Sequence, residues 1–196
     1  MTGDLPAIVR ATPDDIGAVA DTIAAAFCSL QAATWLVPDR SSRRRVLAAD
    51  FAILADHAMD HGAVHRLADG SGAAVWLYRD GPIPPPPDYD RRLEAACGPF
   101  ADRFRTLDLL LDCHRPAQPH HYLACLAVRP PAQGTGRGTG LLRHAHAHLD
   151  AMGTSSYLEA TGPRVTRLYA RWGYERLAPF ALPDGTGFYP MWRDAT

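Results

Sequence analysis

The sequence predicts a single α/β domain that spans residues 1–196, with strands and helices alternating along the chain. Its length allows one sizeable core, and 47% of its residues are hydrophobic, which is ordinary for a globular protein. Apolar residues recur at the spacing of amphipathic helices and of short strands. A glycine-rich turn lies between the apolar run Tyr122–Val128 and a helical pattern that starts at Leu141. This order of strand, turn and helix is the most informative feature of the chain.

The N-terminal segment is expected to begin with a short strand at Ala7–Arg10. Thr12 and Pro13 suit the N-cap and the first position of the helix that follows. Apolar residues recur along this helix at helical spacing: Ile16, Val19, Ala20, Ile23 and Phe27. We expect an irregular stretch at Leu30–Arg40 and then a second helix at Ser41–His57.

Two apolar runs in the middle of the chain read as a β-hairpin. They are Gly62–Leu67 and Ala73–Tyr78, and the turn between them is Asp69–Gly72. The following segment, Gly81–Pro87, contains four consecutive prolines and cannot form a helix or a central strand. It is therefore expected to be a stiff, extended connection.

The second half of the chain is expected to alternate helices and strands. Two helices, Tyr89–Cys97 and Phe100–Cys113, are separated by the pair Gly98-Pro99, which interrupts helical structure. The later elements are a strand at Tyr122–Val128, a helix at Gly136–Met152, a strand at Ser156–Ala160, a helix at Val165–Trp172, and strands at Tyr174–Leu177 and Gly187–Trp192. The sequence contains no internal repeat, which agrees with one domain.

The turn Gln133–Gly140 predicts an anion-binding site. Glycine lets the backbone approach a ligand, and the first turn of the next helix offers free N–H groups at the positive end of its dipole. The chain contains no lysine, which excludes a Walker A loop. A Gly-x-Gly-x-x-Gly fingerprint also fails, whether it is counted from Gly134 or from Gly136. The other interpretation is a flexible glycine turn that binds nothing.

Two motifs resemble the GCN5-related N-acetyltransferase (GNAT) superfamily. The segment Leu126–Gly138 is similar to that family's acetyl-CoA motif, Val-x-Pro-x-x-Gln-Gly-x-Gly-x-Gly. The segments Tyr157–Ala160 and Leu168–Tyr174 resemble its later strand and its Leu-Tyr-x-x-x-Gly-Phe/Tyr helix end. The match covers roughly residues 114 to 175. Other features are similar to the puromycin N-acetyltransferase-like branch: His114-Arg115-Pro116, Ala25-Ala26-Phe27, Trp35 and Pro38-Asp39-Arg40.

The resemblance implies a mixed, mostly antiparallel sheet of about six or seven strands, flanked by helices and splayed open at its central strands. It also implies acetyl-CoA as the acetyl donor. The residues expected to bind this cofactor are Leu126, Ala127, Val128, Gln133, Gly134, Thr135, Gly136, Arg137, Gly138 and Thr139. Many family members have an asparagine four residues before the catalytic tyrosine, where it contacts the cofactor arm, and this chain has Val165 there. Backbone groups, Thr161, Arg164 or Arg167 would then supply that contact.

Acetyl transfer to an amine needs one group that takes a proton from the amine and another that protonates the departing thiolate. An alkyl amine has a pKa of about 10 and is mostly protonated at neutral pH. The resemblance implies that Tyr169 is the general acid and makes Glu159 a candidate base, acting directly or through water. The residues alone leave two alternatives open, a core aromatic for Tyr169 and a salt bridge to an arginine for Glu159.

The acceptor site is expected to include Trp35, Phe27, His121 and Tyr122. Trp35 lies in the stretch expected to be irregular, where it would form a pocket wall or anchor the loop to the core. His120 and His121 begin the central strand, so their side chains point to opposite faces and one of them is a candidate for the acceptor site. The alternative is that both histidines are solvated.

The expected function is acetyl-CoA-dependent N-acetyltransfer to a small-molecule amine, such as an antibiotic or another secondary metabolite, in a ternary complex without a covalent intermediate. The alternatives are a non-catalytic acyl-CoA or drug-binding module on the same scaffold and a peptide or protein acetyltransferase. Tyr169 and Glu159 favour the enzyme, whereas Val165 favours the module. The sequence does not identify the acceptor or decide between a monomer and a homodimer.

Composition argues against several other classes of function. A net charge of −1 gives no electrostatic footprint for nucleic acid or an anionic membrane, and no apolar run reaches the length of a membrane span. Without the layout of a signal peptide, a cytoplasmic protein is expected. No metal site is expected, because His144 and His148 share a helix face without a nearby carboxylate. The cysteines form no Cys-x-x-Cys pair; they are Cys28, Cys97, Cys113 and Cys125.

Overall fold

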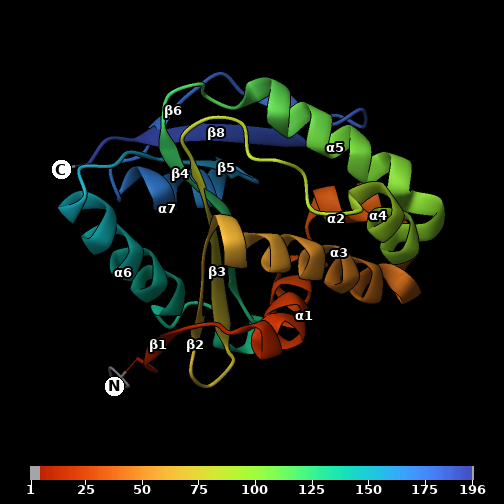
Figure 1. Cartoon of the computed structure of the whole chain (residues 1–196), viewed down its shortest axis with the longest axis horizontal. Coiled ribbons are helices and arrows are strands. Elements are labelled where there is room, and N and C mark those ends of the chain that lie inside the picture. Colours follow the sequence, from red (N-terminus) through yellow and green to blue (C-terminus); the bar gives the residue numbers. More distant parts are fainter. Residues whose placement is uncertain (1–4, 196) are drawn as a thin grey trace.

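A mixed sheet lies at the centre of the computed structural model, which describes residues 5–195 (Figure 1). Within these residues the sheet has eight strands in the order β1-β2-β3-β4-β5-β8-β6, and β7 pairs with β8. The strands are β1 (Ile8–Arg10), β2 (Gly62–Leu67), β3 (Gly72–Arg79), β4 (His120–Val128), β5 (Ser156–Ala160), β6 (Glu175–Arg176), β7 (Phe180–Ala181) and β8 (Gly187–Arg193). Strands β4 and β5 are parallel, whereas the other paired strands are antiparallel. The predicted mixed, mostly antiparallel sheet is confirmed.

Helices cover both faces of this sheet. They are α1 (Ile16–Phe27), α2 (Gln31–Leu36), α3 (Arg40–His61), α4 (Tyr89–Cys97), α5 (Ala101–His114), α6 (Arg137–Ala151) and α7 (Pro163–Ala170). Helices α1 and α3 pack on one face, and α6 and α7 pack on the other (Figure 1). Helices α4 and α5 form a further layer over α2 and α3. None of the helices within the described residues is both long enough and apolar enough to cross a bilayer.

Two expectations about the elements were wrong, and one strand was not expected. The stretch Leu30–Arg40 is not irregular, because it contains α2, which is too short to show a helical period in the sequence. Helix α3 extends to His61, one turn beyond the expected end, and its start is fixed by Asp39, whose carboxylate accepts the N–H groups of Ser41 and Ser42 at 3.1 Å each. The sheet also gains β7, a two-residue strand that pairs with β8.

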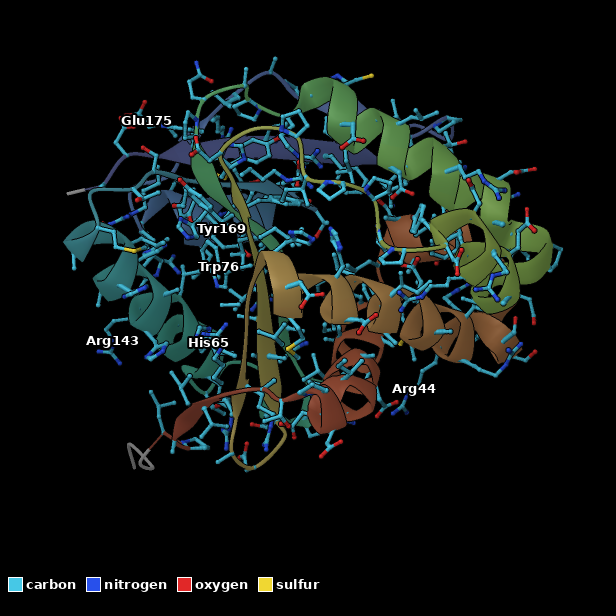
Figure 2. All side chains as sticks on the ribbon, in the orientation of Figure 1. Arg44, His65, Trp76, Arg143, Tyr169 and Glu175 are labelled. Carbon is cyan, nitrogen blue, oxygen red and sulfur yellow. The ribbon has the colours of Figure 1, made fainter. Side chains whose placement is uncertain are left out.

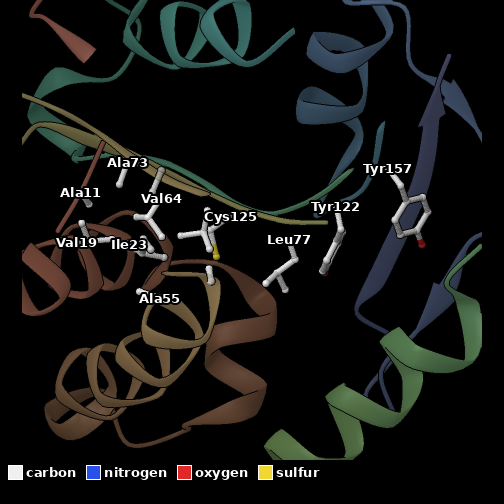
Figure 3. Close-up of a cluster of buried hydrophobic side chains, with 13 residues drawn as sticks. Ala11, Val19, Ile23, Ala55, Val64, Ala73, Leu77, Tyr122, Cys125 and Tyr157 are labelled. Atoms are coloured by element: carbon white, nitrogen blue, oxygen red, sulfur yellow. The ribbon is translucent and has the colours of Figure 1, made fainter. Parts of the chain in front are cut away.

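The two faces of the sheet bury different sets of side chains because residues alternate along each strand. On β4, Tyr122, Cys125 and Ala127 face α1 and α3, whereas Leu123 faces α6. Figure 3 shows the first of these clusters, with Cys125 and Tyr122 on β4 and Tyr157 on β5. Each face of the sheet therefore has its own core.

The sheet forks between its two parallel strands. Strands β4 and β5 pair only at His121 with Ser156 and at Tyr122 with Tyr157, and beyond these positions they separate. The register between β3 and β4 shifts at the same level, which leaves Ala124 unpaired as a β-bulge and bends β4 away from β5. The splayed central strands that the family resemblance implied are therefore present.

Candidate active site

A cavity of about 1490 Å³ runs through the fork in the sheet. On the face of α1 and α3 it is lined by Phe27, Asp50 and Asp108, and on the face of α6 and α7 by Val165 and Tyr169. Phe27 packs against the core on the first face, and Val165 and Tyr169 pack in the core on the second. The opening between β4 and β5 is thus a passage that joins one face of the sheet to the other.

The glycine turn has the geometry that an anion needs. Gly134 and Gly136 have φ angles of +75° and +84°, which L side chains rarely adopt. A Cβ at either position would meet no atom within 4 Å, so the backbone is open to the cavity that both residues line. Helix α6 starts directly after Gly136, and no side chain caps it. Its first N–H groups and its positive dipole end are therefore available to a phosphate.

Side chains of the turn itself hold this backbone in place. The Gln133 side-chain amide donates to the Val128 carbonyl at 3.0 Å, and the Thr135 hydroxyl donates to the Ala132 carbonyl at 2.6 Å. Arg137 donates to the hydroxyls of Ser71 and Thr135 at 2.9 and 2.7 Å. These bonds tie the turn to the end of β4 and to the β2–β3 hairpin, which pre-organises the anion site.

Most residues expected to bind the cofactor line the cavity; the exceptions are Ala127 and Thr135. The Ala127 side chain packs in the core on the face of α1 and α3, as alternation along β4 requires. Thr135 uses its hydroxyl inside the turn. Both residues remain candidates for backbone contacts rather than side-chain contacts.

Helix α7 adds basic side chains to the same end of the cavity. Arg164, Arg167 and Arg171 all line it, as does Val165. Sequence reasoning named the first two arginines and missed Arg171. The signal was present, because residues at positions 164, 167 and 171 recur every three or four residues and share one helix face. Val165 presents an apolar surface where many family members have an amide.

Tyr169 reaches the fork from α7. Its side chain is 7% exposed, lines the cavity and stacks edge-to-face on Tyr174 at 5.6 Å between ring centroids. Figure 2 shows its position beside Trp76 of β3. Burial, and to a lesser extent Tyr174 and Cys125, raise the pKa of Tyr169, so its hydroxyl stays protonated at neutral pH. That hydroxyl makes no hydrogen bond within residues 5–195 and is a free proton donor at the cavity wall.

Glu159 occupies the other side of the fork, on β5. Its side chain lines the cavity, and its Oε1 is buried without a hydrogen-bond partner among the described residues. Burial raises the pKa of Glu159, and the nearby hydroxyls of Tyr122 and Tyr157 and the Arg115 guanidinium offset part of that rise. No ion pair involves Glu159 in the part of the chain that the structure describes, so the salt-bridge alternative is not what is observed.

Two arginines border the same space: Arg79, which the sequence did not indicate, and Arg115 of the His114-Arg115-Pro116 feature. The guanidinium carbons of Arg79 and Arg115 lie 5.7 and 5.3 Å from the ring centroid of Tyr122. Arg115 also forms an ion pair with Asp112. Burial, then the neighbouring Arg115, lowers the pKa of Arg79. Tyr122 is therefore a cavity residue, and the charged groups around it come from β3, from β5 and from the C-terminal end of α5.

The other residues expected at the acceptor site divide into two groups. Phe27 lines the cavity and packs edge-to-face on Phe51 at 5.6 Å. His121 does not line it, because its side chain is on the α6 face, where it stacks on Tyr78 at 4.8 Å. Trp35 does not line it either. It packs between the α2–α5 cluster and the cluster around β7 and β8.

Trp35→Ala is accordingly expected to act on stability rather than on acceptor binding. The Trp35 carbonyl accepts a hydrogen bond from Arg103, whose guanidinium carbon lies 5.6 Å from the indole centroid. Loss of this half-buried ring should reduce the free energy of unfolding by about 2 kcal/mol. Thermal unfolding measures this change, with the exposed Leu109→Ala as the control that should have little effect. An unchanged melting temperature together with a raised acceptor KM would contradict the anchoring role.

The histidines of α6 do not form a metal centre. Within residues 5–195 no group of three or more His, Cys, Asp or Glu side chains is placed to hold a metal ion. His144 instead stacks on His65 of β2 at 4.9 Å between ring centroids. Burial, followed by the neighbouring His144, lowers the pKa of His65 to about 4, so the His65 imidazole is uncharged at neutral pH.

The comparisons with known proteins agree with this geometry. Residues 96–174 match the family model described as "Acetyltransferase (GNAT) family". The match identifies a GNAT acetyltransferase domain at residues 96–174, and the chain has the GNAT fold. A solved structure from Corynebacterium glutamicum ATCC 13032, described as "histone acetyltransferase HPA2 and related acetyltransferase", is 29% identical, with 98% of each chain covered and a TM-score of 0.74.

Two further GNAT structures share the fold at lower identity. A GCN5-related N-acetyltransferase from Rhodopseudomonas palustris is 16% identical, with 99% of this chain and 98% of that chain covered and a TM-score of 0.60. Arylalkylamine N-acetyltransferase 2 from Aedes aegypti is 13% identical, with 97% and 99% covered and a TM-score of 0.62. GNAT enzymes transfer an acetyl group from acetyl-CoA to an amine, and this chain is an acyltransferase of that kind.

Proposed function

We propose that this GNAT enzyme acetylates the amine of a small molecule. The observation that carries the proposal is the lining of the acceptor end of the cavity. That end is lined by Phe27, by Asp50, by Leu111 and by the prolines Pro84–Pro86 of the connection between β3 and α4. A concave site with apolar walls and a few polar groups suits a small amine.

The residues at the opposite end fit acetyl-CoA, which supplies an activated thioester when bound. The open backbone at Gly134 and Gly136 and the uncapped start of α6 would hold its pyrophosphate. The strand edge that β4 exposes beyond Tyr122 has backbone groups without a partner on β5, and these would bind the pantetheine arm. Thermal stabilisation by acetyl-CoA, and none by NAD, is the direct check on this assignment.

The chemistry we propose divides between the two sides of the fork. Glu159 removes a proton from the acceptor ammonium, directly or through water, and leaves a neutral amine that attacks the thioester carbon. Tyr169 donates its phenolic proton to the sulfur as the carbon–sulfur bond breaks. The nitrogen then loses a second proton, which restores the Tyr169 phenol through water, and Glu159 releases the first proton to solvent. The products are an acetamide, CoA with a protonated thiol and one proton, so the reaction needs no further reactant.

The pH profile tests the role of Glu159. The ionised carboxylate is the active form of a base, so kcat/KM should rise as the pH increases through its pKa. Burial raises that pKa above the usual 4.5, so this limb should lie above the range of an ordinary carboxyl. Glu159→Gln should remove the limb and lower turnover about a hundredfold, whereas Glu175→Gln, at an exposed position on β6, should change neither. A Glu159→Gln enzyme with the wild-type profile would exclude Glu159 as the base.

The identity of the acceptor amine is the most specific part of the proposed function. Arylalkylamine acetyltransferases and a histone acetyltransferase relative are among the similar structures, so both small amines and peptides belong in the test. An antibiotic or another secondary metabolite remains our first candidate, and membership of the puromycin N-acetyltransferase-like branch remains a prediction.

Four free cysteines in the described residues agree with a reducing compartment such as the cytoplasm.

The decisive experiment measures release of CoA thiol from acetyl-CoA over a panel of amine antibiotics, arylalkylamines, diamines and lysine-containing peptides. We expect turnover with at least one small amine and background rates with peptides. Turnover with peptides alone would overturn the small-molecule proposal. Binding of acetyl-CoA without turnover of any acceptor would instead indicate a binding module.

A further inference from the structure

The acceptor end of the cavity contains a pair of carboxyl groups that the transfer chemistry does not use. Asp50 comes from α3 and Asp108 from α5, and both line the cavity. Within residues 5–195, Asp50 has no hydrogen bond and no ion pair. Asp108 accepts one hydrogen bond among these residues, from the Tyr89 hydroxyl to its Oδ2 atom at 2.5 Å. The arginines nearby are already paired, Arg92 with Asp56 of α3 and Arg115 with Asp112 of α5.

The surroundings make a second negative charge unfavourable in the empty cavity. Burial, and then the neighbouring Asp108, raise the pKa of Asp50 to about 8. Burial also raises the pKa of Asp108; the Tyr89 hydroxyl and the Arg115 guanidinium offset part of that rise, and Asp112 adds to it. Two neighbouring carboxyls that Arg115 compensates only in part are costly to keep ionised, and a bound cation would reduce that cost.

The carboxyl pair lies in the same cavity as the transfer centre. Asp50, Glu159 and Tyr169 all line this cavity, as does Cys125 of β4 beside the bulge in the fork. One ligand that occupies the cavity can therefore extend from the transfer centre toward the carboxyl pair.

We propose that Asp50 and Asp108 bind a second cationic group of the acceptor, so that the substrate is an amine with two positively charged nitrogens. This inference rests on the proposed function, since one nitrogen must reach the transfer centre. The charges of the cavity then orient the substrate. The arginines of α7 at the cofactor end repel the second cation, as do Arg79 and Arg115 beside Tyr122. The carboxyl pair attracts it.

The test compares α,ω-diamines of increasing length with n-alkylamines of the same carbon number. We expect the wild-type enzyme to prefer one diamine length, with a KM about tenfold or more below that of the matched monoamine. Asp50→Asn should raise the KM of the diamine about tenfold and leave the KM of the monoamine and kcat nearly unchanged. Asp108→Asn should act in the same direction.

Asp56→Asn is the matched control, because Asp56 lies on the same helix and pairs with Arg92 but does not line the cavity. It should leave both KM values unchanged. Equal KM values for diamine and monoamine in the wild-type enzyme would overturn the proposal, as would an Asp50→Asn variant that weakens both substrates equally.

A binding measurement separates this proposal from the proposed function. The best diamine should raise the melting temperature of the wild-type protein without acetyl-CoA, and it should not do so for Asp50→Asn. One outcome is that the diamine stabilises the wild-type protein but not Asp50→Asn, and that no amine is acetylated. This outcome would support the cation site and contradict the enzyme assignment. Acetylation of monoamines without any effect of Asp50→Asn would support the enzyme assignment and overturn the cation site.

Discussion

Tyr169→Phe should lower turnover by about a hundredfold or more while the affinity for acetyl-CoA stays nearly the same. The substitution removes only a hydroxyl that has no hydrogen-bond partner among the described residues, so little packing is lost. A general acid contributes in the transition state and not in ground-state binding, so kcat should fall and the cofactor dissociation constant should not change. Steady-state kinetics and calorimetric titration with acetyl-CoA measure the two quantities.

Tyr174→Phe is the matched control, because Tyr174 stacks on Tyr169 but directs its hydroxyl elsewhere. That hydroxyl hydrogen-bonds to Ser156 at 2.9 Å and to His146 at 3.1 Å, inside the core. Its loss should lower the melting temperature and leave kcat of the folded enzyme close to wild type. If Tyr169→Phe weakened acetyl-CoA binding and kept full turnover, Tyr169 would be a packing residue and our assignment would be wrong.

Gly136→Val should abolish the stabilisation of the protein by acetyl-CoA. Two effects act together at this position. The φ angle of +84° disfavours any β-branched residue, and the added side chain would fill the open space in front of the α6 N-terminus. The pyrophosphate could then no longer approach the backbone N–H groups. Thermal shift over a range of acetyl-CoA concentrations measures the loss.

Gly185→Val separates strain from the loss of ligand space. Gly185 has a φ angle of +86° and open surroundings, much like Gly136, but lies in the turn between β7 and β8 and does not line the cavity. This variant should lose stability and still respond to acetyl-CoA. A full acetyl-CoA response in the Gly136→Val protein would exclude the glycine turn as the phosphate site.

The cofactor end could be predicted from the sequence because it is local. The glycine turn, the strand before it and the helix after it are contiguous between residues 120 and 151, so their order in the chain is also their order in space. The family resemblance also predicted the fork in the sheet. In the structure the fork arises because β4 and β5 form only two residue pairs and β4 has a bulge. Neither apolar periodicity nor composition encodes a bulge, which depends on how three strands pair.

The acceptor end could not be predicted because its residues meet only in the folded protein. Asp50, Arg79 and Asp108 come from α3, β3 and α5, and each looks like an ordinary surface charge in its own helix or strand pattern. Trp35 illustrates the opposite error. The sequence left two roles open for Trp35, a pocket wall and a core anchor. Which one holds depends on α2, a helix too short to show a helical period of apolar residues. Substrate residues in this fold are set by long-range packing, which local patterns do not report.

The fork in the sheet also makes cofactor binding a contribution to folding. Strands β1–β4 and β5–β8 are joined in the sheet by only two residue pairs, and otherwise the two halves are held together by side chains that share the cores on its faces. A molecule that hydrogen-bonds to the free edge of β4 takes the place of the missing part of the ladder and couples the halves. Ligand release and partial opening of the sheet are then linked equilibria, so the same few backbone groups govern the residence time of the cofactor and the cooperativity of the domain.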